Sequence, residues 1–235
     1  MSHRLTRRTW AALGILLVAI PALMAVFVCV WDERKYYLTS LLLVGLMFVP
    51  FVLRFEGRRP QARELVLLAT MTALAVAGRA AFYWLPQCKP VCAIVILTAV
   101  AFTPEAGFVT GAAAGLISNF FFGQGPWTPW QMFAMGIIGW LAGILYRKGV
   151  LRRSKLSLCI FGVIASTVIF GGIMNPASAL MWSNTVNWKI IMSYYVTGIP
   201  VDLVRAVATF VFLWLGAEPM LEKLDRVKTK YGLAE

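Results

Sequence analysis

Histidine, acidic residues and catalytic motifs are scarce in this sequence, and each shortage excludes a class of function. The one histidine, His3, lies near the start of the chain, so no histidine-based metal site or catalytic dyad can form. The 10 acidic residues form no aspartate cluster, and no HExxH helix, GxSxG elbow or phosphate-cradling loop is present. We therefore expect a protein that is not an enzyme and has no metal and no intrinsic cofactor.

Cysteine is also too sparse for a disulfide framework or a zinc site. Cys29 and Cys159 stand alone, while Cys88 and Cys92 are four residues apart. We interpret all four as membrane-buried thiols. A bridge between Cys88 and Cys92 stays open as the alternative.

Apolar residues, by contrast, are abundant. Of the 235 residues 60% are hydrophobic and 14% are charged, and the mean hydropathy is +0.76. This is more apolar surface than a soluble domain can bury, which indicates an all-α integral membrane protein. The net charge of +12 does not indicate nucleic-acid binding, because the basic residues sit in short clusters between apolar runs.

The apolar runs predict eight membrane spans. A signal peptide is the competing interpretation of the first run, but no small-residue cleavage site follows it. A further amphipathic segment, Met174–Lys189, is expected at the membrane interface. The predicted spans are Trp10–Trp31, Tyr36–Leu53, Leu65–Trp84, Val91–Phe102, Ala106–Phe122, Trp130–Tyr146, Leu156–Ile173 and Ile190–Leu215.

The distribution of Lys and Arg predicts the orientation of these spans. With eight spans, sixteen of the 22 basic residues fall on one side and four on the other. Since basic loops remain cytoplasmic, both termini are expected in the cytoplasm of a protein of the cell membrane. We divide the chain into an N-terminal two-span hairpin with a basic connector (1–60), a six-span core (61–217) and a cytoplasmic tail (218–235).

The stretch Glu105–Tyr146 is the centre of the predicted core. Its two helices repeat small residues four apart, a spacing that lets helix backbones approach closely in a membrane. The turn between them, residues 123–130, has no charge but contains two tryptophans, an amide and two prolines. This composition suits a binding rim for a ligand that is both polar and flat.

Aromatic and amide side chains gather in the three predicted outward segments and nearby. An interfacial aromatic belt explains many tryptophans, but it does not require the accompanying Asn and Gln, which need partners away from water. We therefore favour a ligand site. The three outward segments lack carboxylates, which argues against a cationic ligand. The candidate ligand-binding residues are Trp84, Asn119, Gln124, Trp127, Trp130, Gln131, Asn184, Trp188 and Tyr195.

Three charges lie inside predicted spans, where each costs about 2.5 to 3.5 kcal/mol and calls for a partner. Asp202 and Arg205 are three apart and can pair on their own helix. Alternatively, Arg79 pairs with Asp202 across the bundle. The sequence leaves both alternatives open.

The third predicted span presents Ala69, Ala73 and Ala77 on one face. Such a strip can pack inside the bundle or can dock another membrane subunit. From the residues alone, internal packing is the simpler interpretation.

Several motifs resemble the substrate-binding S components of energy-coupling factor (ECF) vitamin transporters. They are ATMTA at Ala69–Ala73, KPVCAIVI from Lys89, the glycine-repeat helix running into SNFFFGQGPWTPWQMFAMGIIGWLAGIL, and PVDLVRAVAT from Pro200. The resemblance covers residues 63–215 and implies a six-helix S-component core, to which the N-terminal hairpin is an addition. It also implies that Ala69 and Ala73 contact the coupling subunit.

The resemblance implies a function as well. An S component captures a vitamin from outside and delivers it through a coupling membrane subunit and two cytoplasmic ATPases, which hydrolyse the ATP. The sequence looks most like the cobalamin-type members; riboflavin, pantothenate or a queuosine precursor are the alternatives. Rivals from other classes are a membrane enzyme acting on a lipid headgroup through Asp202 and Arg205, and an accessory membrane subunit without a small ligand.

Overall fold

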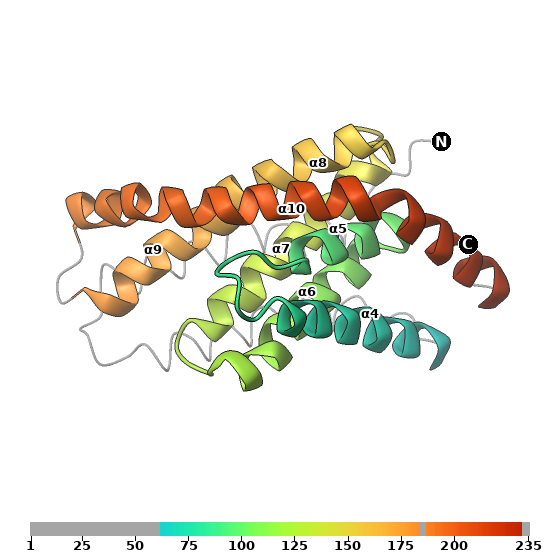
Figure 1. Ribbon diagram of the computed structural model, residues 1–235, viewed down its shortest axis with the longest axis horizontal. Coiled ribbons are helices and arrows are strands. Elements are labelled where there is room, and N and C mark those ends of the chain that lie inside the picture. The colour runs from blue at the N-terminus through green and yellow to red at the C-terminus, as the bar shows by residue number, and fades with distance from the viewer. Residues whose placement is uncertain (1–61, 184–186, 232–235) are drawn as a thin grey trace, which may run out of the picture.

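The computed structural model describes residues 62–183 and 187–231, and in these ranges all regular structure is helical. The predicted N-terminal hairpin and Asn184 lie outside the described residues. Figure 1 shows the helices packed into one bundle with α10 along its length. The elements are α4 (Ala62–Ala81), α5 (Val91–Ala101), α6 (Pro104–Phe122), α7 (Thr128–Arg147), α8 (Lys155–Ile164), the π-helical turn η2 (Ala165–Phe170), α9 (Gly171–Trp182) and α10 (Trp188–Tyr231).

Four helical stretches are long and apolar enough to cross a membrane by length and composition: α4, α7, the continuous stretch Lys155–Trp182, and α10. Helix α5 is apolar but shorter. The all-helical prediction is therefore confirmed for the described residues, and these helices fit a protein that spans the membrane. The count of eight spans stays a prediction, because its first two fall outside the described residues.

Helix α5 is the centre of the core. All of its residues from Val91 to Ala101 are buried, and it contacts α4, α6, α7, α8 and α10. A helix that is apolar on every side is covered either by lipid or by other helices, and here other helices cover it. Prolines stand next to both of its ends: Pro90 is the N-cap residue of α5, and Pro104 is the first residue of α6.

Helices α6 and α7 form the tight hairpin that the glycine spacing predicts. A Cβ atom on Gly111 would collide with the Met135 carbonyl group, and Cβ atoms on Gly107 and Gly139 would each meet the other residue's carbonyl. The backbones therefore touch where the glycines lie. Thr103 starts α6 by accepting a hydrogen bond from the Ala106 amide at 3.1 Å.

The segment expected at the membrane interface from Met174 behaves differently. The helix that begins at Lys155 continues through η2 and α9 to Trp182, so the first half of the segment is part of the bundle. Pro176 lacks the N–H that would bond the Gly172 carbonyl. The Tyr195 hydroxyl donates to that carbonyl instead, at 3.0 Å, which lets the helix pass the proline.

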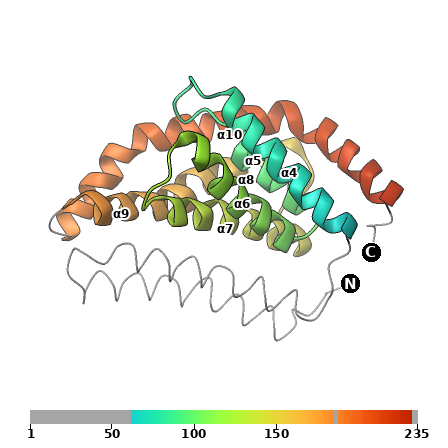
Figure 2. The ribbon, with the colours of Figure 1, turned by 90° about the horizontal axis from the view of Figure 1, so that it is seen from below.

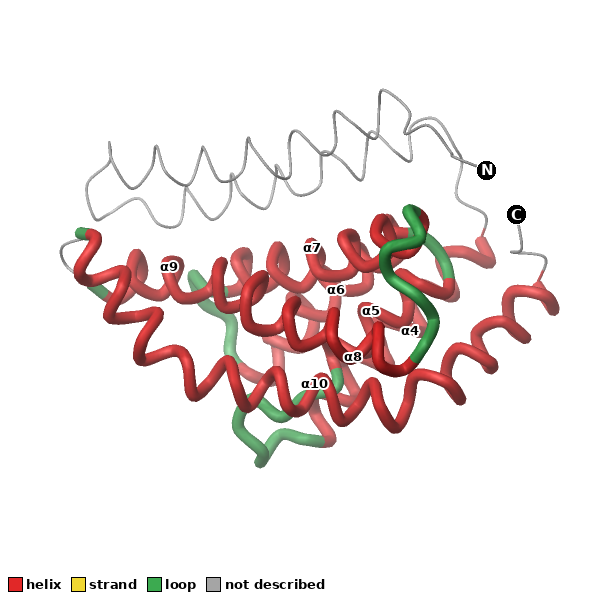
Figure 3. Tube along the Cα trace, turned by 90° about the horizontal axis from the view of Figure 1, so that it is seen from above, coloured by secondary structure: helices red, strands yellow, loops and turns green. Residues whose placement is uncertain are grey.

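Helix α10 is also longer than the predicted span. It runs without a break from Trp188 to Tyr231, through residues expected to form a tail. Leu221 and Leu224 join the main core, so burial keeps this part helical. Figures 2 and 3 show α10 as a bowed helix, consistent with the two prolines inside it, Pro200 and Pro219.

The loops gather at two ends of the bundle. The Trp127 end, toward the left of Figure 1, is where α6 and α9 finish and α7 and α10 begin. The α4–α5 loop lies nearer the middle of α10, where Gln87 bonds to Arg205. The Tyr231 end, toward the right, is where α4 and α8 begin and α7 and α10 finish. Most of the candidate ligand-binding residues that the structure describes belong to the Trp127 end, whereas Trp84 lies in the α4–α5 loop.

Candidate functional site at the Trp127 end

A hydrogen-bonded amide network holds the α6–α7 turn. Its centre is Asn119, which is 1% exposed. The Asn119 amide nitrogen donates to Thr128 Oγ1 and to Gln131 Oε1, both at 3.0 Å. Thr128 Oγ1 in turn donates to Gln124 Oε1 at 2.9 Å, and the Gln124 nitrogen donates to the Leu116 carbonyl at 2.9 Å. Three of the predicted ligand residues thus bond to one another or to the turn.

Arg79 ties α4 to this network. Its Nη1 donates to Asn119 Oδ1 at 3.0 Å and also to the Ser118 hydroxyl. The guanidinium carbon lies 4.5 Å from the centre of the Phe122 ring. Within the described part of the chain, Arg79 has no carboxylate partner, because the ion pairs found there join other residues. Its charge is held by a hydroxyl, an amide oxygen and an aromatic face.

Some polar groups of the network keep free hydrogen-bonding capacity. Both N–H groups of Asn119 donate, and its oxygen accepts. The Gln124 nitrogen uses one of its two N–H groups, for the Leu116 carbonyl, and the Gln124 oxygen accepts from Thr128. Among the described residues, the Gln131 nitrogen and the Nε and Nη2 atoms of Arg79 bond to no partner. All of these are donors. The network can therefore offer a ligand hydrogen bonds to acceptor atoms.

The tryptophans at this end differ in their surroundings. Trp130 is only 5% exposed and belongs to a hydrophobic cluster, so it packs the bundle. Trp127 and Trp182 stack with ring centres 6.2 Å apart and planes 18° apart, which joins the α6–α7 turn to the end of α9. Trp84, Trp182 and Trp188 are 87%, 66% and 71% exposed.

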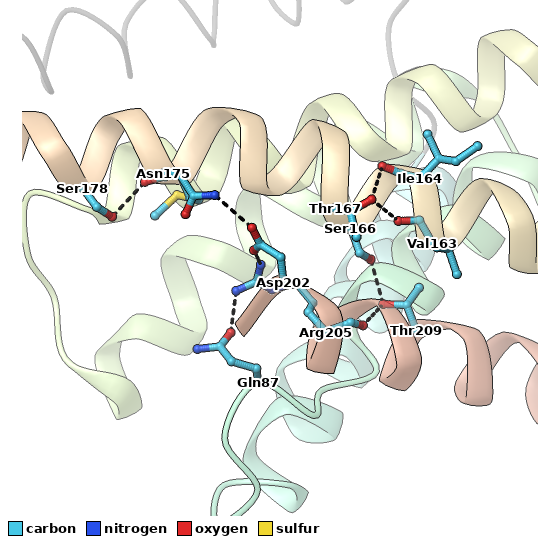
Figure 4. A network of polar contacts seen from close by, with 11 residues as sticks. Gln87, Val163, Ile164, Ser166, Thr167, Asn175, Ser178, Asp202, Arg205 and Thr209 are labelled. Carbon is cyan, nitrogen blue, oxygen red and sulfur yellow. Dashed lines mark hydrogen bonds and ion pairs between the residues drawn. The ribbon is translucent and has the colours of Figure 1, made fainter. Parts of the chain in front are cut away.

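A second polar network lies between α9 and α10 (Figure 4). Arg205 donates to Asp202 Oδ1 at 2.6 Å, and Asn175 donates to Asp202 Oδ2 at 2.9 Å. The other Arg205 nitrogen donates to Gln87 Oε1 at 2.6 Å, and its guanidinium lies 4.1 Å from the Phe170 ring centre. Of the two alternatives for the intramembrane charges, the structure has the pair on one helix.

Small residues make this second network possible. A Cβ on Gly171 would collide with the Asp202 carboxylate, and one on Gly198 would collide with the Asn175 amide. One turn further along, Ser166 of the π-helical turn donates to Thr209 at 3.0 Å. Polar side chains inside a membrane protein need such partners, because no water is available to replace them.

The structure brings only some of the predicted ligand residues together. Asn119, Gln124 and Gln131 share one network, whereas Tyr195 bonds to Gly172 beside the second one. Sequence reasoning missed Ser118 and Thr128. Thr128 is the first residue of α7, where a hydroxyl can bond to the preceding turn, and this position was the available signal.

The alanine strip of α4 faces outward: Ala69, Ala73 and Ala77 are all exposed. Met71, Thr72 and Ala75 on the opposite face are buried. The internal-packing interpretation of the strip therefore does not hold within the described bundle. Among the described cysteines no bridge is formed, since Cys88, Cys92 and Cys159 are all free.

Comparison with known proteins identifies the family. Residues 60–217 match the family described as ECF-type riboflavin transporter, S component. This match spans well over half of the chain, so the chain belongs to this family of S components. An S component is the substrate-binding subunit of a transporter and catalyses no reaction, as the missing catalytic motifs predicted.

Among curated proteins, the chain is similar to a UPF0397 protein of Vibrio atlanticus (strain LGP32). The two are 26% identical over 125 residues, which is 50% of this chain and 68% of the relative. No solved structure matches the chain. These comparisons support a vitamin-binding S component; they do not support the cobalamin type in particular.

Proposed function

We propose that this protein captures a flat, acceptor-rich vitamin of the riboflavin class at the Trp127 end and delivers it to an ECF module. The observation that carries the proposal is the combination of a stacked tryptophan pair with unused N–H donors of Gln131 and Arg79. Trp127 and Trp182 offer aromatic faces for a ring system. Gln131 and Arg79 offer N–H groups for its oxygen and nitrogen acceptors.

Riboflavin fits this site, because its isoalloxazine ring is flat and carries several acceptor atoms along one edge. The match names that ligand for the family, and for this chain it is our inference. In the proposed site Trp127 stacks on the ring, Gln131 and Arg79 donate to its edge, and Asn119 and Gln124 hold these groups in place. Tyr195 does not contact the ligand in this proposal; it supports α9 through its hydrogen bond to the Gly172 carbonyl.

Cobalamin is the second candidate, favoured by a different observation. Trp84, Trp182 and Trp188 come from three segments and are each at least 66% exposed. Each offers an exposed aromatic face of the kind a large corrinoid could cover.

Delivery requires partners and an orientation. We propose that the exposed Ala69 and Ala73 contact the coupling membrane subunit, since a flat small-residue strip lets a partner helix approach closely. Two ATPases bound to that subunit would supply the energy. The basic loop at 147–155 and the end of α10 would then lie in the cytoplasm, with the Trp127 end outside.

The test is calorimetric titration of the purified full chain in detergent with riboflavin, cyanocobalamin and pantothenate in parallel. We expect tight one-to-one binding of riboflavin, accompanied by quenching of its fluorescence when it stacks on tryptophan. Binding of cyanocobalamin alone would replace the proposed ligand with the second candidate. Absence of binding for all three by a folded, monodisperse sample would contradict the proposed ligand class.

A further inference from the structure

The last part of α10 lies beyond the family match and forms a fixed surface of its own. The match ends at residue 217, whereas the helix continues to Tyr231. Leu221 and Leu224 anchor this extension in the hydrophobic core. The extension is thus packed as part of the bundle. This packing fixes the direction in which the side chains of its exposed face point.

Polar contacts fix the extension further. Arg153 donates through both terminal nitrogens to the Asp225 carboxylate, at 2.7 and 3.0 Å. Lys155 pairs with Glu218 at 2.8 Å. Arg63, at the start of α4, donates to the Tyr231 carbonyl at 3.0 Å. The start of α4, the α7–α8 loop and the end of α10 therefore meet at the Tyr231 end (Figure 1).

These contacts pair most of the carboxylates at this end with basic residues, and several other basic residues remain exposed. Glu218 and Asp225 are paired, and Glu105 pairs with Arg147 at 3.8 Å. Of the acidic residues in the extension, only Glu222 has no ion pair among the described residues. The exposed basic residues at this end form what we call the cationic rim: Arg63, Lys148, Arg152, Lys223, Arg226 and Lys230.

The cationic rim continues an exposed apolar surface of α10. Val207, Val211 and Leu215 repeat four apart along α10 and are 61%, 43% and 69% exposed, so this face is apolar and unpartnered. Two turns after Leu215 the same face presents Lys223, followed three residues later by Arg226. A helix face that changes from apolar to cationic crosses the boundary between hydrocarbon and headgroups.

Helix α4 repeats the change at its start. Leu65 and Val66 are 49% and 66% exposed, and Arg63 precedes them in the same first turn. Two helices thus bring cations to the level where their apolar exposed faces end. An acidic protein partner would require no such register with the apolar face, whereas lipid phosphates lie at this level.

We propose that the cationic rim binds the headgroups of anionic phospholipids, with Lys223, Arg226 and Lys230 as its main contacts. Guanidinium and ammonium groups bond phosphate oxygens with charge assistance. Because the ion pairs of Arg153 and Lys155 hold the extension on the bundle, bound lipid stabilises the contact between α10 and α8. This proposal does not depend on the ligand at the Trp127 end.

The experiment uses the full chain in neutral detergent with added dioleoylphosphatidylglycerol or dioleoylphosphatidylcholine. Lipid retention is counted by native mass spectrometry, and the unfolding midpoint is followed in parallel. The test variant is K223Q/R226Q/K230Q, and its matched control is K223R/R226K/K230R, which keeps the charge. Lys189→Gln removes an exposed cation at the opposite end.

We expect phosphatidylglycerol to bind and to raise the unfolding midpoint, and phosphatidylcholine to do neither. With about 1 kcal/mol for each surface cation, the triple Gln variant should bind phosphatidylglycerol on the order of 100-fold more weakly. The charge-keeping variant and Lys189→Gln should behave like the wild type, and raised salt should weaken binding.

Three outcomes would overturn the proposal. Equal binding of the two lipids would mean that charge plays no part. Unchanged phosphatidylglycerol binding by the triple Gln variant would place the lipid elsewhere. Complete displacement of phosphatidylglycerol by an equimolar poly-glutamate peptide would make the cationic rim a surface for an acidic protein instead.

Discussion

Helix α4 and the α6–α7 hairpin carry the same sequence signal and use it in opposite ways. Both repeat small residues four apart, as alanines in α4 and as glycines in α6 and α7. In α7, 78% of the span is buried inside the bundle, and in α4 only 17% is. The spacing therefore indicates that a backbone can be approached closely, and it does not indicate by which partner.

The choice between glycine and alanine explains part of this difference. In the hairpin a single added carbon would collide with backbone, as at Gly111, so only glycine fits. In α4 the alanine methyl groups point away from the described bundle, so no close backbone contact there requires glycine. Glycine thus marks the contact made within this chain, while exposed alanine leaves room for another protein.

Gly111→Leu should have the largest effect on folding. The added side chain would meet the Met135 carbonyl group, which cannot move without separating α6 from α7. We expect destabilisation by about 3 kcal/mol or more and poor expression, measured by thermal unfolding in detergent. The control is Gly216→Ala, where an added Cβ meets no atom within 4 Å. Equal behaviour of the two variants would show that the hairpin contact is not tight.

Asn119→Ala tests the polar link between the two regions. The substitution leaves Arg79, Thr128 and Gln131 without a shared partner in a buried site. Each unsatisfied polar group costs about 1 to 3 kcal/mol, so we expect a clear drop in the unfolding midpoint and weaker ligand binding. Thr70→Ala is the control, because its hydroxyl is exposed and bonds only within α4. A midpoint unchanged by Asn119→Ala would mean that water replaces the amide.

Trp127→Ala should affect binding more than folding. Trp127 lies in the turn and stacks on Trp182 at the surface of the bundle. Loss of one stacking ring weakens ligand binding by about 1 to 3 kcal/mol, which riboflavin titration would measure. Trp214→Ala is the matched control, since Trp214 stacks on Phe210 of α10. Unchanged affinity for riboflavin would assign Trp127 to an interfacial belt.

Ala73→Leu should change the stability of the isolated chain least, within about 0.5 kcal/mol, because the side chain is exposed. If α4 docks on the coupling subunit, the same variant should abolish uptake in cells and leave ligand binding intact. The paired variant Ala75→Leu lies on the buried face, at 0% exposure, and should reduce stability, binding and uptake together. Normal uptake with Ala73→Leu would separate the alanine strip from docking.

The glycines of α6 and α7 and the carboxylate of Asp202 show which contacts could be predicted from the sequence and which could not. The glycine spacing predicted the α6–α7 contact correctly, because it is a local requirement that any close partner must meet. The pairing of Asp202 was left open, because a carboxylate on one helix can reach either neighbour until the rotation of the helix is fixed. Rotation is set by packing: here Gly171 and Asn175 hold the carboxylate beside Arg205.

The length of the last helix and the role of the amides were beyond sequence reasoning for a related cause. Residues 218–231 are charged enough to suggest a solvated tail, and only contact with the core through Leu221 and Leu224 makes them a helix of the bundle. Asn119 and Gln124 look like ligand groups in the sequence. In the structure they form hydrogen bonds within the protein, to Thr128, Gln131 and Arg79.

The sequence by itself determined the membrane class and the approximate positions of the apolar helices, because these depend on composition and on spacing along one helix. The tertiary structure alone decided which small residues face a neighbour, which charges pair and which polar groups keep free donors. These properties depend on the rotation and the end-to-end register of each helix against the others, and no single helix contains that information.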